Sequence, residues 1–416
     1  KLGRPKIVNS IDSVIASRFK VYMSPISLKY VTGAIEKFVA LTNPPFECIL
    51  KPCTKEQIMF APTYQFRTPD GTYMSTYMRT EHQAEIVILA KMMNSLQFVF
   101  DVNKADIVLI PMMVTTFCAV YGMRNRCVFA TDHVEDMLRE VETLQENCAS
   151  NKPHLVLATQ DSTENPVALL DLQKKQNCQF YVVDLGPSFN GMVVPSLDTY
   201  VGRQNANWQG LSFDDREYFV VLSFGPRYDD RIAVAEELQN YTGSKNVFYR
   251  PPTFGPPLGG HKDIGFYEVD SNCKAIFVLC FPGDEAYQKR IYDTWASGAI
   301  PVVVKRHCPE GKTHFRICHW EVNNSVFGAP FYPATINKTY PQIPGLEYEE
   351  IIVEIPAETV AAKQTMPFLE SIPEEEIRQK LGKINMMRSN FIYDLEGSGQ
   401  DAYTALLHNL AGRLGL

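Results

Sequence analysis

Six short runs of apolar, often β-branched residues constrain the fold of this chain more than any other feature of its sequence. Within each run the apolar residues do not alternate with polar ones, which is the pattern of strands that are buried on both faces of a parallel sheet. The six runs cover residues 106–111, 154–158, 179–183, 218–222, 275–279 and 300–304.

Segments with apolar residues at helical spacing lie between and after these runs. Residues 132–148 begin with an acidic N-cap and continue with apolar residues that fall on one helix face, namely Val134, Met137, Leu138 and Val141. Residues 229–241, 285–297, 373–391 and 400–414 have the same pattern, and a further helix is expected over 77–93. This alternation of strands and helices predicts an α/β protein with doubly wound parallel sheets.

A polar stretch divides the chain of 416 residues into halves of similar size. Residues 200–212 are rich in Asn, Gln and Gly and separate two α/β runs. We therefore predict an N-terminal α/β domain over residues 1–205 and a C-terminal α/β domain over 206–416, which includes the terminal helices. Two such domains facing each other across a cleft suit a two-substrate enzyme, because open α/β sheets bind ligands at the carboxyl ends of their strands.

The charge balance excludes some classes of partner. A net charge of −7 makes nucleic acid and anionic membranes poor candidates. Lys and Arg form no basic run in the N-terminal half, so we expect a neutral or weakly charged partner there. No apolar run reaches the roughly 18 residues that span a bilayer.

Cysteines and glycosylation sequons indicate the compartment. None of the ten cysteines forms a Cys-x-x-Cys pair, so a zinc ribbon or a thioredoxin-type site is not expected. Short spacings such as Cys118/Cys127 suggest disulfides, and buried thiols are the alternative. Three Asn-x-Ser/Thr sequons, at Asn240, Asn323 and Asn337, favour a protein of the secretory pathway.

The clearest site pattern lies in the second half. A strand leads into Pro282-Gly283-Asp284, and the following helix carries Lys289, Arg290 and Asp293. Glycine lets the backbone approach a ligand closely, and the helix N-terminus suits a phosphate group. Lys289 or Arg290 can neutralise a diphosphate and Asp293 can bind a ribose diol, as acidic residues do in other nucleotide sites. The alternative is an ordinary strand-to-helix turn capped by Asp284.

These residues resemble the donor-site signature of the exostosin-like glycosyltransferases, which include the heparan-sulfate exostosins and plant galactosyl-, xylosyl- and arabinosyltransferases. The signature comprises Pro282-Gly283-Asp284, Arg290, Tyr292-Asp293 and residues 298–302. The resemblance extends over about residues 20–395 through further family motifs, which fall at Glu85, Asp101, Ala105, Pro111, Asp161, Phe224-Gly225, Arg231, 348–356 and 372–376.

The resemblance implies a GT-B glycosyltransferase that inverts the anomeric centre in polysaccharide or glycoprotein synthesis. It would need no cofactor, take a nucleotide sugar as donor, which we expect to be UDP-linked, and act on a glycan or glycoprotein acceptor. It implies the Golgi lumen and a type II membrane anchor that this sequence does not contain. The donor residues would be Gly225, Arg231, Pro282, Gly283, Asp284, Lys289, Arg290 and Asp293. No Asp-x-Asp occurs at a strand end, so we expect no metal; the cations of Arg231, Lys289 and Arg290 would stabilise the leaving diphosphate.

Two carboxylates are candidates for the base that deprotonates the acceptor hydroxyl. Asp161 follows a predicted strand, and Glu85 lies on a predicted helix. The alternatives are a helix N-cap for Asp161 and a solvated helix face or structural ion pair for Glu85. His82 and His261 are not included in the catalytic prediction. The alternative function is a non-catalytic subunit of the same fold, which binds a glycan or assembles with an active transferase; homo- or hetero-oligomers are both open.

Overall fold

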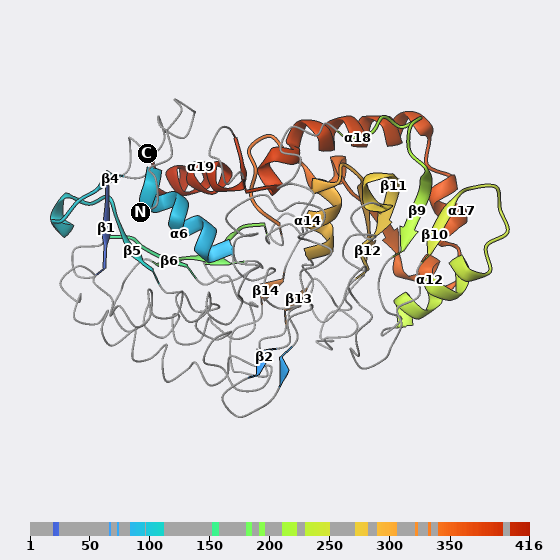
Figure 1. The fold of residues 1–416 in the computed structure, drawn as a ribbon, viewed down its shortest axis with the longest axis horizontal. Helices are drawn as coiled ribbons and strands as arrows, with labels where there is room; N and C mark the ends of the chain where they lie inside the picture. Colours follow the sequence, from blue (N-terminus) through green and yellow to red (C-terminus); the bar gives the residue numbers. More distant parts are fainter. Residues whose placement is uncertain are drawn as a thin grey trace.

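The computed structural model describes sixteen segments of the chain, which are residues 20–24, 66–67, 73–74, 84–95, 97–111, 152–157, 180–184, 191–195, 210–222, 229–249, 271–281, 289–305, 321–322, 332–333, 340–393 and 400–416. These segments contain two parallel sheets and the helices that pack on them (Figure 1). The prediction of an α/β protein is thus confirmed.

The first sheet has six strands in the order β4-β1-β5-β6-β7-β8, all paired in parallel. Its strands are β1 (Lys20–Met23), β4 (Gln97–Phe98), β5 (Ile107–Ile110), β6 (His154–Leu157), β7 (Phe180–Asp184) and β8 (Gly191–Val193).

The second sheet has five strands in the order β10-β9-β11-β12-β15, also all parallel. Its strands are β9 (Tyr218–Leu222), β10 (Val247–Tyr249), β11 (Ala275–Leu279), β12 (Ile300–Lys305) and β15 (Val353–Pro356). Two short antiparallel pairs complete the described strands, β2 (Phe66–Arg67) with β3 (Tyr73–Met74) and β13 (Glu321–Val322) with β14 (Tyr332–Pro333).

The central strands are buried on both faces, as their unalternated sequences predict. All residues of β5, β6 and β11 are buried. In β12 only the last residue, Lys305, is exposed, and its ammonium lies 3.2 Å from the Glu354 carboxylate on the neighbouring strand. Apolar residues occupy successive positions because both faces of these strands are buried, as in other parallel sheets.

Most predicted helices form with shifted ends. The described helices are α6 (Ala84–Ser95), α12 (Asp229–Gln239), α14 (Lys289–Ala296), α16 (Ala357–Ala361), α17 (Thr365–Glu370), α18 (Glu374–Met387) and α19 (Ala402–Leu414), with 3-10 turns η1 (Val102–Lys104), η5 (Tyr348–Glu350) and η6 (Arg388–Phe391). The helix expected over 373–391 continues from α18 into η6. The helix expected over 132–148 lies outside the described residues.

The described apolar side chains form two cores. One gathers the second sheet with α12, α14 and α18, and the other gathers the first sheet with α6. The last helix, α19, belongs to the first core through Tyr403, Leu406, Leu407 and Leu410, and Figure 1 shows it beside α6. Ala405 of the same helix belongs to the second core, so α19 contributes to both. The predicted division at 205/206 lies outside the described residues and stays a prediction.

No helix in the described segments is both long and apolar enough to cross a membrane.

Candidate functional site

The carboxyl ends of β9 and β11 define the candidate donor site. The two strands are parallel neighbours, with Val220 opposite Phe277, so their carboxyl ends lie at the same edge of the sheet. The chain leaves β9 toward α12 and leaves β11 toward α14. Arg231 on α12, and Arg290 and Asp293 on α14, therefore belong to the two helices that follow these strand ends, and ligands bind at such an edge in open α/β sheets.

Arg231, in the first turn of α12, makes a contact between these two connections. Its guanidinium Nη2 donates a 2.9 Å hydrogen bond to the carbonyl oxygen of Phe281, just beyond β11. Phe281 is fully buried and Arg231 is half-buried. A guanidinium held by a backbone carbonyl has a restricted orientation, so the structure brings Arg231 to the residue that precedes Pro282-Gly283-Asp284.

Helix α14 presents two different faces. Ile291, Tyr292 and Trp295 are buried in the second core, whereas Arg290 and Asp293 are half-buried. Arg290 and Asp293 are three residues apart and therefore neighbours on the helix surface. A cation and a carboxylate on one half-buried helix face suit a ligand that carries both a diphosphate and a diol.

Aromatic packing fixes the orientation of α14. The Trp295 ring stacks on Phe391 with centroids 4.3 Å apart and meets Tyr340 edge-on at 5.3 Å. Its indole Nε1 donates to the carbonyl oxygen of Ile351 at 3.2 Å. Burial raises the pKa of the neighbouring Tyr292 phenol far above its ordinary value, so this group stays protonated and cannot act as a base. Rotation of α14 would disrupt this packing, so the polar face keeps its direction.

Gly298 has a structural role that the motif alone did not reveal. Its φ of 71° lies in the left-handed region, where the chain leaves α14 and enters β12. The carbonyl oxygen of Gly298 accepts a 2.8 Å hydrogen bond from Nη2 of Arg216. Arg216 is buried and also donates to the carbonyl oxygen of Leu211 at 2.9 Å, and burial lowers its pKa to about 10. Sequence reasoning missed Arg216, since a single arginine carries no pattern.

Glu85 lies in the first turn of α6 and is completely buried, with 0% of its surface exposed. A solvated helix face, one of the alternatives considered for this residue, is therefore wrong. A catalytic base must come within hydrogen-bond reach of the acceptor hydroxyl. Glu85 can serve as the base only in a conformation that opens its surroundings.

Several residues of the sequence prediction lie outside the described part of the chain. They are Asp161, Gly225, Pro282, Gly283, Asp284, Asn323 and Asn337, together with His82 and His261. Lys289 is the first residue of α14. The predictions for these residues stay as they are.

The sequon residue Asn240 is exposed and follows α12 directly. Its Nδ2 donates a 2.7 Å hydrogen bond to the carbonyl oxygen of Glu236. Residues 242–246 beyond it are exposed as well. The structure thus leaves room for a glycan at Asn240.

Two of the ten cysteines are described. Cys273 and Cys280 are thiols and do not form a disulfide, and Sγ of Cys280 lies 3.4 Å from Oγ1 of Thr294 inside the second core. The other eight cysteines lie outside the described residues, so the expected disulfides stay a prediction. Within the described segments no group of three or more His, Cys, Asp or Glu side chains is arranged to hold a metal ion.

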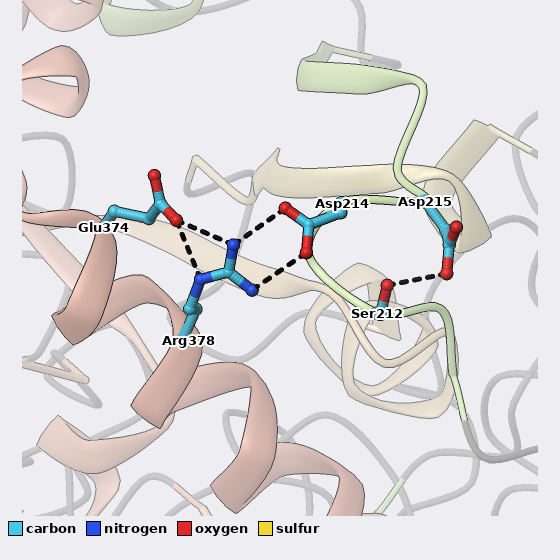
Figure 2. A network of polar contacts seen from close by, with 5 residues as sticks. All are labelled: Ser212, Asp214, Asp215, Glu374 and Arg378. Atoms are coloured by element: carbon cyan, nitrogen blue, oxygen red, sulfur yellow. Dashed lines mark hydrogen bonds and ion pairs between the residues drawn. The ribbon is translucent and has the colours of Figure 1, made fainter.

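A surface network joins residues 212–215, which precede β9, to α18 (Figure 2). The Arg378 guanidinium contacts Asp214 and Glu374, each at 2.7 Å, and lies over the Phe213 ring at 4.4 Å. Nearby, Oγ of Ser212 donates to the Asp215 carboxylate at 2.6 Å. These groups are largely exposed, and exposed ion pairs contribute little to stability. We therefore assign the network to anchoring of residues 212–215 and not to the candidate site.

No protein-family model matches the chain, and a search of curated proteins finds no match either.

Proposed function

We propose that this protein is an inverting glycosyltransferase with a GT-B arrangement of two α/β domains. The C-terminal half binds a nucleotide sugar, in our proposal a UDP-sugar, and the N-terminal half binds a glycan or glycoprotein acceptor. Two parallel sheets support the architecture, since each has a carboxyl edge at which a substrate can bind.

The contact between Arg231 and Phe281 carries this proposal. The two residues are 50 positions apart, and each adjoins a motif that resembles the exostosin-like family. Their hydrogen bond links the first turn of α12 to the residue just beyond β11, and this supports a single site at this edge of the second sheet. Arg290 and Asp293, both half-buried, lie on α14, the helix that follows this strand, and they support the assignment of the donor site.

The reaction is a single displacement. The acceptor hydroxyl oxygen forms a bond to the anomeric carbon while the bond between that carbon and the diphosphate oxygen breaks. The diphosphate leaves with the electron pair, and a base takes the hydroxyl proton. Arg231, Lys289 and Arg290 are the cations that we propose for the developing charge on the leaving group, without a metal.

Asp161 and Glu85 remain the two candidate bases. Burial of Glu85 means that it needs a change of conformation to meet the acceptor. The test compares Asp161→Asn with Glu85→Gln, because both changes keep the shape of the side chain and remove its basic character. The variant that lacks the base should lose roughly 10²–10⁴-fold in turnover while it still binds UDP. Near-normal turnover of both variants would remove both residues from the proposal.

Binding tests the donor assignment directly. Isothermal titration calorimetry with UDP should show binding to the wild-type chain and weaker binding to Arg290→Gln. Arg378→Gln is the matched control, because Arg378 lies in the surface network and not at the sheet edge. Equal affinities for all three proteins would contradict the donor site. Binding of UDP without any sugar transfer, across a panel of UDP-sugars and acceptors, would favour the non-catalytic subunit.

We also propose that the protein acts in the secretory pathway, in the Golgi lumen. The exposed side chain of Asn240 in its sequon supports this assignment. Protein secreted from eukaryotic cells should lose mass on treatment with a peptide N-glycosidase, and Thr242→Ala should remove the contribution of this sequon. A chain that carries no N-glycan at all would contradict the assignment.

A further inference from the structure

The described residues 388–393 and 400–404 together connect the two cores, and we call these two stretches the tie. It begins at η6 against α14 and ends in the first turn of α19 against α6 (Figure 1). Each end of the tie is held by buried contacts.

The first end is locked into the second core. Phe391 stacks on Trp295 of α14, with an interplanar angle of 23°. Arg388, which is 4% exposed, donates from Nε to the carbonyl oxygen of Ala296 at 2.5 Å. The last turn of α14 therefore cannot move without η6, unless a stacked aromatic pair and a charged hydrogen bond are lost.

The second end is locked into the first core. Oη of Tyr393 donates a 3.0 Å hydrogen bond to the carbonyl oxygen of Pro195, just beyond β8. The Asp401 carboxylate, which is 1% exposed, lies 2.7 Å from Nζ of Lys91 on α6. Asp401 is also the N-cap of α19, because its Oδ1 accepts a 2.9 Å hydrogen bond from the backbone N–H of Thr404.

Hydrogen bonds join the two ends of the tie directly to each other. The backbone N–H of Ala402 donates to the carbonyl oxygen of Ile392 at 2.9 Å. Nε2 of Gln400 donates to Oδ1 of Asn390, also at 2.9 Å. These bonds fasten the beginning of α19 directly to η6, so the two ends form one body.

We propose that the tie couples α14 to α6, so that a displacement of the donor helix is transmitted to the helix that carries Glu85. The role of this coupling in catalysis rests on the proposed function, whereas the mechanical coupling of the two helices does not. Removing one partner of a buried ion pair leaves an uncompensated charge, so Lys91 and Asp401 stay together when the tie moves. Close-packed contacts such as Phe391 on Trp295 transmit a shift in the same way. A donor that repositions α14 thereby biases α6 toward the conformation in which Glu85 meets the acceptor.

Hydrogen–deuterium exchange of the whole chain tests the coupling without any ligand. Phe391→Leu removes the aromatic stack at one end and keeps an apolar side chain. We expect amides of α6, at the other end, to exchange roughly two- to tenfold faster, the equivalent of the 0.5–1.5 kcal/mol of an aromatic pair. Ile377→Val is the matched control, because Ile377 is buried in the second core on α18 and does not belong to the tie. Its α6 amides should exchange as in the wild type.

Coupling is reciprocal, so the converse experiment must also succeed. Asp401→Asn keeps an N-cap acceptor and removes the buried charge, and amides of α14 should exchange faster in this variant. Faster exchange that is confined to the mutated end in both variants would overturn the proposal. An equal response of α6 to Ile377→Val would overturn it too, because the effect would then be general destabilisation. A protein that binds no UDP but shows the exchange effect in both directions would refute the proposed function and leave the coupling in place.

Discussion

Acid should destabilise the first sheet through one buried histidine. His154 begins β6, between Val108 of β5 and Phe180 of β7, and is 0% exposed. Burial lowers its pKa from 6.5 to about 4, against a smaller rise from a backbone hydrogen bond with Lys152. The imidazole is therefore neutral in the folded protein at pH values where it is already protonated in the unfolded chain.

The depressed pKa fixes both the sign and the size of the effect. The full stability is present above pH 6.5 and is lost as the pH falls toward 4, because His154 binds a proton in the unfolded chain and stays neutral in the folded protein over this range. At about 1.4 kcal/mol for each pKa unit, the difference between 6.5 and about 4 corresponds to roughly 3.5 kcal/mol, of which roughly 3 kcal/mol is lost by pH 4, where the folded histidine is half protonated.

Urea unfolding, followed by far-ultraviolet circular dichroism between pH 7 and pH 4, measures this loss. His154→Leu removes the titrating group, so its stability should fall by about 3 kcal/mol less than that of the wild type over this range. Val156→Ala, a change at a buried position of the same strand, should lower stability at every pH and keep the wild-type slope. If His154→Leu and the wild type lose stability in parallel down to pH 4, the imidazole is not held neutral by burial.

Three further outcomes are expected. Asp293→Ala should weaken UDP binding by roughly 1.5–3 kcal/mol in calorimetry in a chain that stays folded, because the proposed ligand partners of this carboxylate are hydroxyls. Sugar transfer should survive excess EDTA, and activity that is abolished by EDTA and restored by manganese or magnesium would contradict the metal-free diphosphate site. Lys363→Gly should raise the free energy of unfolding, measured by thermal denaturation, by roughly 0.5 kcal/mol. Lys363 has a left-handed φ of 55°, which costs a residue with a side chain about 1–2 kcal/mol and costs glycine nothing. The loss of the exposed ion pair with Glu236 offsets part of this gain.

The strands and the fold class could be predicted because their cause is local. A strand buried on both faces needs apolar residues at successive positions, and β5, β6, β9, β11 and β12 have such runs in the sequence. The helices also followed from spacing, although α14 begins at Lys289 among the described residues and α18 passes into η6 before the end of its apolar pattern. Local sequence patterns therefore predict the presence of a helix or strand more accurately than they predict its ends.

The candidate site was predictable only in part. The motif around Arg290 and Asp293 led to a helix face that is half-buried, as a ligand-binding face requires. The same reasoning gave Glu85 a possible solvated position, and the structure buries it completely. One carboxylate on a helix has no sequence pattern that tells a surface from an interior, because burial depends on which elements pack over it.

The sequence by itself therefore determined the α/β class, the approximate strands and helices, and the residue types of the proposed donor site. Only the tertiary structure decided that Arg231 reaches the carbonyl oxygen of Phe281 and that α19 returns to the first sheet to pair Asp401 with Lys91. The physical reason is the range of the interactions. Strand and helix patterns arise from residues that are close in the sequence. The partner of Arg231 is 50 positions away and that of Asp401 is 310 positions away. Such pairs depend on how the elements pack and on the free-energy cost of leaving a buried polar group unpaired.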